Sequence, residues 1–435
     1  METVCEFKLN DPLPSELTED IVEVSAIRVG TNQVGKAVKS MKGRLFSGRG
    51  VRSVIEDPND RNSRLLLLNL GEDQDKMIED LKEEGVECNP STAQQLNLRR
   101  GLKEIISGLL PEGIASPSGF EVLGSVAMIY LRPAQIPYRF AIGQAILITQ
   151  PGLKVVANKS EKLSNEYRVP ILELIAGVGD FSTEVNEGKV KIKLDPSKVY
   201  YCSKLEHERS RVLESVKEGE FIVDACCGVG PFTLRAAKEK KAKVVANDLN
   251  PACYEYLSLN IKTNKLDKLV TPSCDDARKM IGRVLEDWAQ KKVETPRFFM
   301  NLPGLAVDFL DAFGESKVMP PPHKFRIDVY TFQENEETEE KTVKGIKHRI
   351  EKNLGKLAPF VAYLGFHFVK NVSNTKAMVC ASFLVFPDLE SAKLERESKK
   401  EIISGDGKGV KKDDESINSN GNEEVLRKRG EPKEN

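Results

Sequence analysis

Regular hydrophobic patterning is sparse in the first hundred residues. An irregular start leads to an apolar run at 64–70, which predicts a β-strand, and then to a helical pattern over 94–110. A Leu-Pro-Glu-Gly sequence at 110–113 interrupts that helix. We therefore predict an N-terminal domain over residues 1–108.

A second pattern occupies residues 109–197. Short apolar runs of strand length surround a single helical stretch at 139–150. The strands are predicted at 125–131, 153–158, 169–177 and 189–194. Mixed strands around one helix indicate a separate, small α+β domain.

Strands and helices alternate from residue 198 to residue 388. Strands are predicted at 221–224, 243–248, 270–274, 297–304, 360–369 and 377–386, and helices at 233–241 and 252–266. This alternation predicts an α/β fold with a doubly wound, Rossmann-like sheet. Beyond Pro387 the chain is charged and polar without periodicity, so residues 389–435 are expected to form a disordered charged tail.

The most distinctive stretch is FIVDACCGVGPF at 221–232, where an apolar strand ends in Asp224 and is followed by Gly228 and Gly230. A dinucleotide-binding loop needs G-x-G-x-x-G and a Walker loop needs G-x-x-x-x-G-K-[ST], and this stretch has neither spacing. A carboxylate before the turn would repel a pyrophosphate, but it suits a ligand that carries an ammonium group. The glycines allow the backbone to approach that ligand closely.

The next strands also end in polar side chains. Asp248 follows the second strand, 24 residues after Asp224 (248 − 224), where an acid in a doubly wound sheet faces a ribose diol. Asp276 follows the third strand, where its carboxylate can accept from an adenine amino group. This ordered set resembles the class I methyltransferases, which bind S-adenosylmethionine, a cationic amino acid joined to a nucleoside. The resemblance implies that Asn301, at the end of the fourth strand, lies beside the transferable methyl group.

Composition lends little support to other kinds of site. The eight cysteines are scattered, with no C-x-x-C pair and no His at ligand spacing, so we predict no metal site and expect Cys226 and Cys227 to pack at the strand end. No uncharged run approaches a membrane span, and the acidic start has neither a secretory core nor an arginine-rich transit pattern. The formal net charge of −1 argues against a uniformly basic nucleic-acid surface. Residues 28–52 nevertheless carry many basic residues and no acid, which suits a phosphate backbone, although a solvated loop fits almost as well.

The segment before the first strand of the sheet makes the resemblance specific. Residues 199–209 read VYYCSKLEHER. Together with the stretch at 221–232, NDLNP at 247–251 and MNLPG at 300–304, they resemble the archaeal and eukaryotic tRNA (guanine-37) N1-methyltransferase family. The resemblance covers roughly residues 100–388. It implies a class I catalytic domain, preceded by a small middle domain and by an N-terminal domain that recognises tRNA shape.

The resemblance also implies site residues, with Glu208 as the general base. Guanine N1 carries a proton and is a poor nucleophile, so a carboxylate must take that proton as the methyl group arrives. A guanidinium such as Arg168 would stabilise the charge that develops on the neighbouring carbonyl oxygen, and Asn301 would hold the base edge. Cofactor contacts are implied for Arg209, Asp224, Gly228, Gly230, Asp248, Leu249, Asp276, Ala277 and Asn301, and contacts to the target base for Tyr200, Asn301 and Pro303. The chain departs from the family at 202–204, where Cys-Ser-Lys replaces the usual Ser-Pro-Arg, which affects the fine positioning of that loop.

Three alternatives stay open at this point. A sister enzyme on the same fold transfers the aminocarboxypropyl group of the cofactor to a tricyclic tRNA base, but it lacks the Glu-Arg pair of Glu208 and Arg209. A small-molecule methyltransferase would not need the middle domain and the basic segment. A catalytically dead class I fold could serve as an RNA-binding module. We expect a monomer that binds tRNA in the cytoplasm and nucleus, and the resemblance leaves the mitochondrial matrix open.

Overall fold

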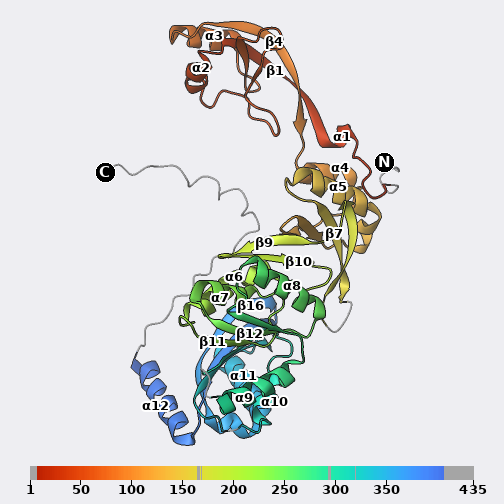
Figure 1. The fold of residues 1–435 in the computed structure, drawn as a ribbon. Helices are drawn as coiled ribbons and strands as arrows, with labels where there is room; N and C mark the ends of the chain where they lie inside the picture. The colour runs from red at the N-terminus through yellow and green to blue at the C-terminus, as the bar shows by residue number, and fades with distance from the viewer. Residues whose placement is uncertain (1–6, 164–166, 168, 292–294, 319, 406–435) are drawn as a thin grey trace.

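A computed structural model describes residues 7–405 except 164–166, 168, 292–294 and 319. Three parts follow one another in Figure 1: an N-terminal lobe in red and orange, a middle domain, and a larger domain in green and blue.

The N-terminal lobe is a four-stranded sheet in the order β2-β3-β1-β4, with two helices packed against it. The side chains of Ile27, Leu66 and Met77 lie in its buried core. The elements are β1 (Glu19–Gly30), α2 (Val34–Ser40), β2 (Val54–Glu56), β3 (Ser63–Leu67), α3 (Gln74–Glu83) and β4 (Cys88–Arg99).

Two predictions for this lobe are wrong. The irregular start contains the twelve-residue strand β1, and the helix predicted over 94–110 begins only at Leu102, because residues up to Arg99 belong to β4. Leu96 and Leu98 alternate with exposed residues and pack against the small apolar cluster of the lobe, which is the period of a strand. Gly101 separates the two elements, and its N–H donates to the Glu104 carboxylate in the first turn of the helix.

The middle domain is a four-stranded sheet in the order β5-β6-β7-β8, covered by helices α4 and α5. The segment before β1 also belongs to it, because Asn10 exchanges two hydrogen bonds with the backbone of Gly177, at 2.7 and 3.0 Å. The N-terminal lobe is therefore joined to this domain by the paired strands β1 and β4 (Figure 1). The elements are α1 (Ser15–Thr18), α4 (Leu102–Leu109), β5 (Phe120–Leu123), β6 (Val126–Ile129), α5 (Arg139–Thr149), β7 (Val155–Leu163) and β8 (Pro170–Gly177).

The third part is a seven-stranded sheet in the order β13-β12-β11-β14-β15-β17-β16, in which β17 runs in the opposite direction to the other six strands. Ile222 packs into the core on one face of the sheet, whereas Val223 packs with Trp288 on the other, so both faces are buried. The predicted α/β, doubly wound class is confirmed. The strands are β11 (Phe221–Asp224), β12 (Lys243–Asn247), β13 (Val270–Ser273), β14 (Arg297–Met300), β15 (Phe325–Glu334), β16 (Val361–Ser373) and β17 (Lys376–Val385). The helices are α6 (Glu206–Glu214), α7 (Pro231–Lys240), α8 (Pro251–Thr263), α9 (Ala277–Lys291), α10 (Asp311–Gly314) and α11 (Glu339–Leu354).

A hairpin of β9 (Thr183–Glu187) and β10 (Val190–Leu194) lies between the middle domain and this sheet. Asn260 of α8 accepts from the N–H of Lys193 at 2.8 Å and donates to its carbonyl at 3.0 Å, and Asn264 binds the backbone of Lys191 in the same way. The hairpin, which the sequence analysis assigned to the middle domain, is thus tied to α8 of the third part.

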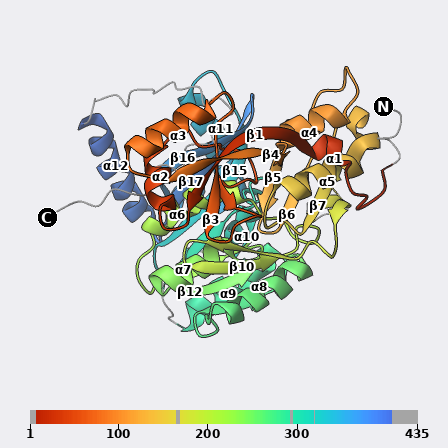
Figure 2. The ribbon, with the colours of Figure 1, turned by 90° about the horizontal axis from the view of Figure 1, so that it is seen from above.

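The tail differs from expectation in its first part. Residues predicted to be disordered from 389 onward form helix α12 (Leu389–Gly405). Ala392 is fully buried, and Arg396 donates to the carbonyl oxygens of Val361 and Pro359 at the start of the edge strand β16. In both Figures 1 and 2 this helix lies on the opposite side of the molecule from α4 and α5. Residues 406–435 lie outside the described residues.

Candidate active site

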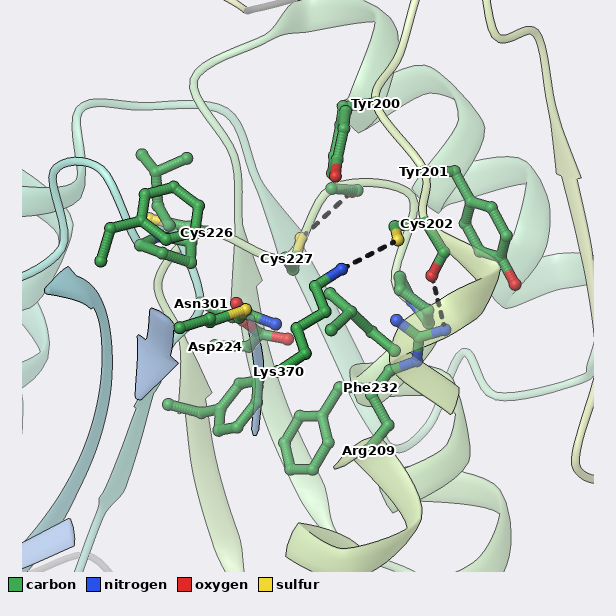
Figure 3. A pocket seen from close by; sticks show the side chains of 18 of the residues that line it. Tyr200, Tyr201, Cys202, Arg209, Asp224, Cys226, Cys227, Phe232, Asn301 and Lys370 are labelled. Carbon is green, nitrogen blue, oxygen red and sulfur yellow. Dashed lines mark hydrogen bonds between the residues drawn. The ribbon is translucent and has the colours of Figure 1, made fainter. Parts of the chain in front are cut away.

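Two adjoining cavities open at the carboxyl ends of β11, β12 and β14. The larger has a volume of about 370 Å³ and the smaller about 170 Å³. We call them the substrate cavity and the nucleoside cavity, and Figure 3 shows the former. The residues that line both are Tyr167, Tyr200, Cys226, Gly228, Asn301 and Leu302. In an open α/β sheet this edge is where ligands bind.

The loop after β11 lets the backbone reach the cavities. Gly228 and Gly230 have φ of +57° and +88°, a left-handed backbone conformation that residues other than glycine rarely adopt. A Cβ at Gly230 would also lie 2.7 Å from Leu257 of α8. Gly228 lines both cavities, so the predicted close approach of backbone to ligand fits the geometry.

Asp224 lies at the end of β11 in the wall of the substrate cavity and is only 1% exposed. One carboxylate oxygen accepts from the Thr233 hydroxyl at 2.7 Å, while the other, Oδ1, has no hydrogen-bond partner. Burial raises the pKa of Asp224 to about 7, with Asp248 adding to the effect and Thr233 opposing it. A buried acceptor without a partner, next to a cavity, suits a cationic ligand group.

The nucleoside cavity brings together the other predicted acids. Asp248 accepts from the N–H groups of Gly228 at 2.8 Å and Asn250 at 3.0 Å, and burial raises its pKa. Asp276 accepts from the N–H of Arg278 at the start of α9. The residues predicted to bind the cofactor that line this cavity are Gly228, Asp248, Leu249, Asp276, Ala277 and Asn301.

Three residues predicted to touch the target base lie together. Tyr200, Asn301 and Pro303 all line the substrate cavity, and Asn301 and Tyr200 reach the nucleoside cavity as well. Tyr167 lines both cavities too. Its neighbour Arg168 lies outside the described residues, so the role predicted for it stays a prediction.

Arg209 lines the substrate cavity but is held by a partner that the sequence analysis did not identify. Its guanidinium forms a bidentate ion pair with Glu187 of β9, with Nη2 at 2.7 Å from Oε2, and Tyr201 donates to the same carboxylate at 2.6 Å. Both members of the pair are buried. Arg209 therefore fixes the β9–β10 hairpin against the cavity wall.

Glu208 lines neither cavity. It is buried at 6% exposure, and Arg211 donates to its two carboxylate oxygens at 2.7 Å each. Tyr330 donates to Oε1 at 2.6 Å, and His367 Nε2 lies 3.4 Å from Oε2. The proposed base is thus held in a network of its own.

Sheet register relates this network to the cavity. Phe332, Met378 and Lys370 are paired across β15, β17 and β16, and all three line the substrate cavity. We call them the cavity row. Tyr330 and Cys380 lie two residues along β15 and β17 from this row, and His367 lies three residues along β16, where the register shifts between Phe368 and Lys370. These three residues are paired in the same way, and we call them the Glu208 row. Because side chains two residues apart share a face, Glu208 contacts the sheet about 7 Å from the cavity row.

Lys370 is a cavity residue that the sequence analysis did not single out. Its side chain reaches toward Cys202, with Nζ 3.8 Å from Sγ (Figure 3). It comes from an edge strand about 140 residues beyond the glycine loop, as the numbering shows (370 − 230 = 140), so only the tertiary fold brings it to the site.

Within the described residues, no group of three or more His, Cys, Asp or Glu side chains could hold a metal ion. The helices described include none that is long and apolar enough to cross a membrane.

Comparison with known proteins identifies the family. A family described as the TRM5/TYW2 methyltransferase domain matches residues 183–354, and a TYW2 N-terminal domain matches residues 102–180. A Phytophthora infestans protein named tRNA (guanine(37)-N(1))-methyltransferase is 32% identical over 409 residues, which is 89% of this chain and 95% of that protein. The chain belongs to the tRNA (guanine(37)-N(1))-methyltransferase family. Its human member is 31% identical and matches over 84% of this chain and 74% of that protein.

Solved structures agree with this assignment. Trm5b from Pyrococcus abyssi is 25% identical, with a TM-score of 0.53 over 83% of this chain and 99% of that one. A complex described as aTrm5 with tRNALeu has a TM-score of 0.60 at 22% identity over 83% of this chain and 99% of that one, and at that identity it supports the fold alone. The chain is therefore a class I methyltransferase, as the strand-end acids predict.

Proposed function

We propose that this protein transfers a methyl group from S-adenosylmethionine to N1 of guanine 37 in tRNA. The observation that carries the proposal is the joined pair of cavities at the strand ends, with the unpartnered Asp224 oxygen in one and Asp248 and Asp276 in the other. Family membership supports the reaction, because the relatives that match most of this chain bear the name of that activity.

The residues present fit the cofactor. Asp224 would accept from its ammonium group, Asp248 from the ribose hydroxyls and Asp276 from the adenine amino group. When bound, S-adenosylmethionine supplies a methyl group on a sulfonium, which is activated for transfer. Asn301 lines both cavities, so it can meet the methyl end of the cofactor and the edge of the target base.

Glu208 is proposed as the base that takes the N1 proton. To reach the cavity, its carboxylate would have to leave Arg211 and move about 7 Å along the strands to the cavity row. Rotation about the bonds of the glutamate side chain can cover most of that distance. Its neighbours Leu205 and Arg209 already line the cavity, so the backbone of α6 stands at the right edge. Arg168 is proposed to stabilise the charge that develops on the guanine carbonyl oxygen, and the Lys370 ammonium would reinforce it electrostatically.

The N-terminal lobe is proposed to contact the tRNA backbone. Of the basic residues between 28 and 52, Arg28 pairs with Asp57, and Arg44 pairs with Glu72 and Asp80. These pairs neutralise part of the predicted basic stretch. Exposed cations on α2 and in the segment between α2 and β2 remain available for phosphate, and they are Lys36, Lys39, Lys42 and Arg52. We propose a monomer that acts in the cytoplasm and nucleus, with the mitochondrial matrix as a further compartment.

The proposal is tested by incubating the full chain and cofactor with unmodified tRNA transcripts that carry guanosine or adenosine at position 37. Nucleoside mass spectrometry should detect 1-methylguanosine only with the guanosine transcript. A methyl group on another position, or equal methylation of both transcripts, would contradict it. No modification with a transcript that binds would favour a dead fold that serves as an RNA-binding module.

A further inference from the structure

The network around Glu208 has an outlet to solvent. The Glu208 side chain is only 5% exposed, whereas the side chain of His367, on β16, is 47% exposed. His367 Nε2 is 3.4 Å from Glu208 Oε2. A base that has taken a proton from guanine must lose it before the next turnover, and a buried carboxylate needs a partner to pass it on.

The other partners of Glu208 are poor proton acceptors. Arg211 carries only donors, and its hydrogen bonds to Glu208 raise its pKa further. Tyr330 is fully buried and already donates to Oε1, and burial raises its pKa well above the usual value. Cys380 of β17, which is paired with Tyr330 on one side and with His367 on the other, is buried as well, and burial raises its pKa to about 12.

His367 has the opposite character. Burial and the Arg211 guanidinium lower its pKa, while Glu208 opposes them, so the imidazole is neutral at pH 7. A neutral imidazole with Nδ1 protonated offers the Nε2 lone pair as an acceptor. It faces Glu208 on one side and solvent on the other.

Resting on the proposed function, we propose that His367 is the proton outlet of the methyl-transfer reaction, and that the position of Glu208 in this structure is where the base discharges. In the cavity, the N1–H bond breaks and its proton forms an O–H bond with Glu208. The nitrogen lone pair forms the bond to the methyl carbon while the carbon–sulfur pair goes to sulfur. Glu208 then returns to the Glu208 row, where its proton moves to Nε2 of His367 and the imidazolium loses a proton from Nδ1 or Nε2 to water.

The hydrogen-bond donors around Glu208 assist the discharge. Arg211 and Tyr330 together direct hydrogen bonds at both carboxylate oxygens. A proton left on either oxygen would face one of these donors, so the network is complete only with an ionised carboxylate. His367 is therefore a positioning and relay residue, and it need not touch either substrate.

The experiment separates the first turnover from later ones. Rapid-quench reactions use the full chain with saturating cofactor and a tRNA transcript in several-fold excess, in dilute buffer at pH 7. The variants are His367→Ala, His367→Gln and, as a matched control, His348→Ala, whose histidine is exposed on α11. The first turnover starts with ionised Glu208, so the His367 variants should keep a first-turnover rate within about twofold of wild type. Their subsequent rate should fall about tenfold or more, and added imidazole should restore it.

Three outcomes decide the matter. A subsequent rate in both His367 variants within twofold of wild type would overturn the relay. A fall that imidazole does not restore, or that is equally large in the first turnover, would assign His367 a structural role and also overturn it. If wild type forms no 1-methylguanosine in its first turnover, the proposed function itself fails, whatever the His367 variants do.

Discussion

Asp224 makes cofactor binding depend on pH in a direction that follows from its burial. Its pKa is raised to about 7 in the free protein, chiefly by desolvation. The ionised form is the one that can pair with an ammonium group, and the α-amino group of the ligand stays protonated below about pH 7.7. Affinity should therefore fall as pH drops through 7, because the carboxylate takes up a proton that binding must expel.

The magnitude follows from that one ionisation. The apparent Kd scales as one plus the ratio of protonated to ionised Asp224, which is about 2 at pH 7 and about 33 at pH 5.5. Between those two pH values the Kd should rise about 16-fold. Isothermal titration calorimetry with S-adenosylhomocysteine, the stable product of transfer, measures it directly. Burial also raises the pKa of Asp248, which would add to the slope, so the comparison needs a variant that removes only Asp224.

That variant is Asp224→Asn, which keeps the shape of the side chain and an acceptor for Thr233. It should bind more weakly at pH 7 and lose most of the pH dependence that wild type shows. A wild-type Kd that stays constant between pH 5.5 and 7 would refute the reasoning about Asp224. Equal slopes in wild type and Asp224→Asn would refute it too, and would assign the titration to Asp248 or to another group.

Further variants test the rest of the site and the N-terminal lobe. Asp248→Ala should weaken cofactor binding by about 1.5 to 3 kcal/mol; an unchanged calorimetric Kd would remove this residue from the nucleoside site. Glu208→Gln should slow single-turnover methylation roughly a hundred-fold or more with little change in either affinity, and a rate within about threefold of wild type would place the base elsewhere. The double variant Lys39→Ala/Lys42→Ala should lower the slope of log Kd for tRNA against log salt by about 1.4 to 1.8. The control Arg44→Ala should change that slope less, because the Arg44 guanidinium is already paired. Equal effects of the two variants would show that the lobe does not contact phosphate through α2.

The strand-end acids could be predicted from sequence because each lies within a few residues of the strand that positions it. Asp224 and Asp248 follow apolar runs directly, and parallel strands bring their carboxyl ends to one edge of the sheet. Their local sequence therefore determines both their element and their place in the site.

The surroundings of Glu208 could not be predicted, since they depend on strand register. Tyr330 and His367 lie 122 and 159 residues beyond it in the chain, as subtraction gives (330 − 208 and 367 − 208), and no local pattern links them. The sequence analysis assigned no element to β15, which carries Tyr330. The motif singled out Glu208 as the base, but in the structure its side chain is buried and turns to the Glu208 row instead of the cavity.

The helix predicted over 94–110 illustrates a different limit. Leu96, Leu98, Leu102 and Ile105 can be read with helical spacing, yet the first two belong to a strand. The strand forms instead of the helix because β4 pairs with β1 over ten residue pairs. β1 lies about seventy residues earlier in the chain. Long-range pairing overrides a weak local periodicity.

The central claim, methyl transfer to guanine 37, is tested most directly with cofactor labelled at two different places. Parallel reactions contain guanosine-37 tRNA transcript, the full chain, and S-adenosylmethionine labelled either on the methyl carbon or on the carboxyl carbon. The account predicts that only the methyl label enters tRNA and that it is recovered in 1-methylguanosine from position 37. Label from the carboxyl carbon in the tRNA would reveal aminocarboxypropyl transfer and would contradict it.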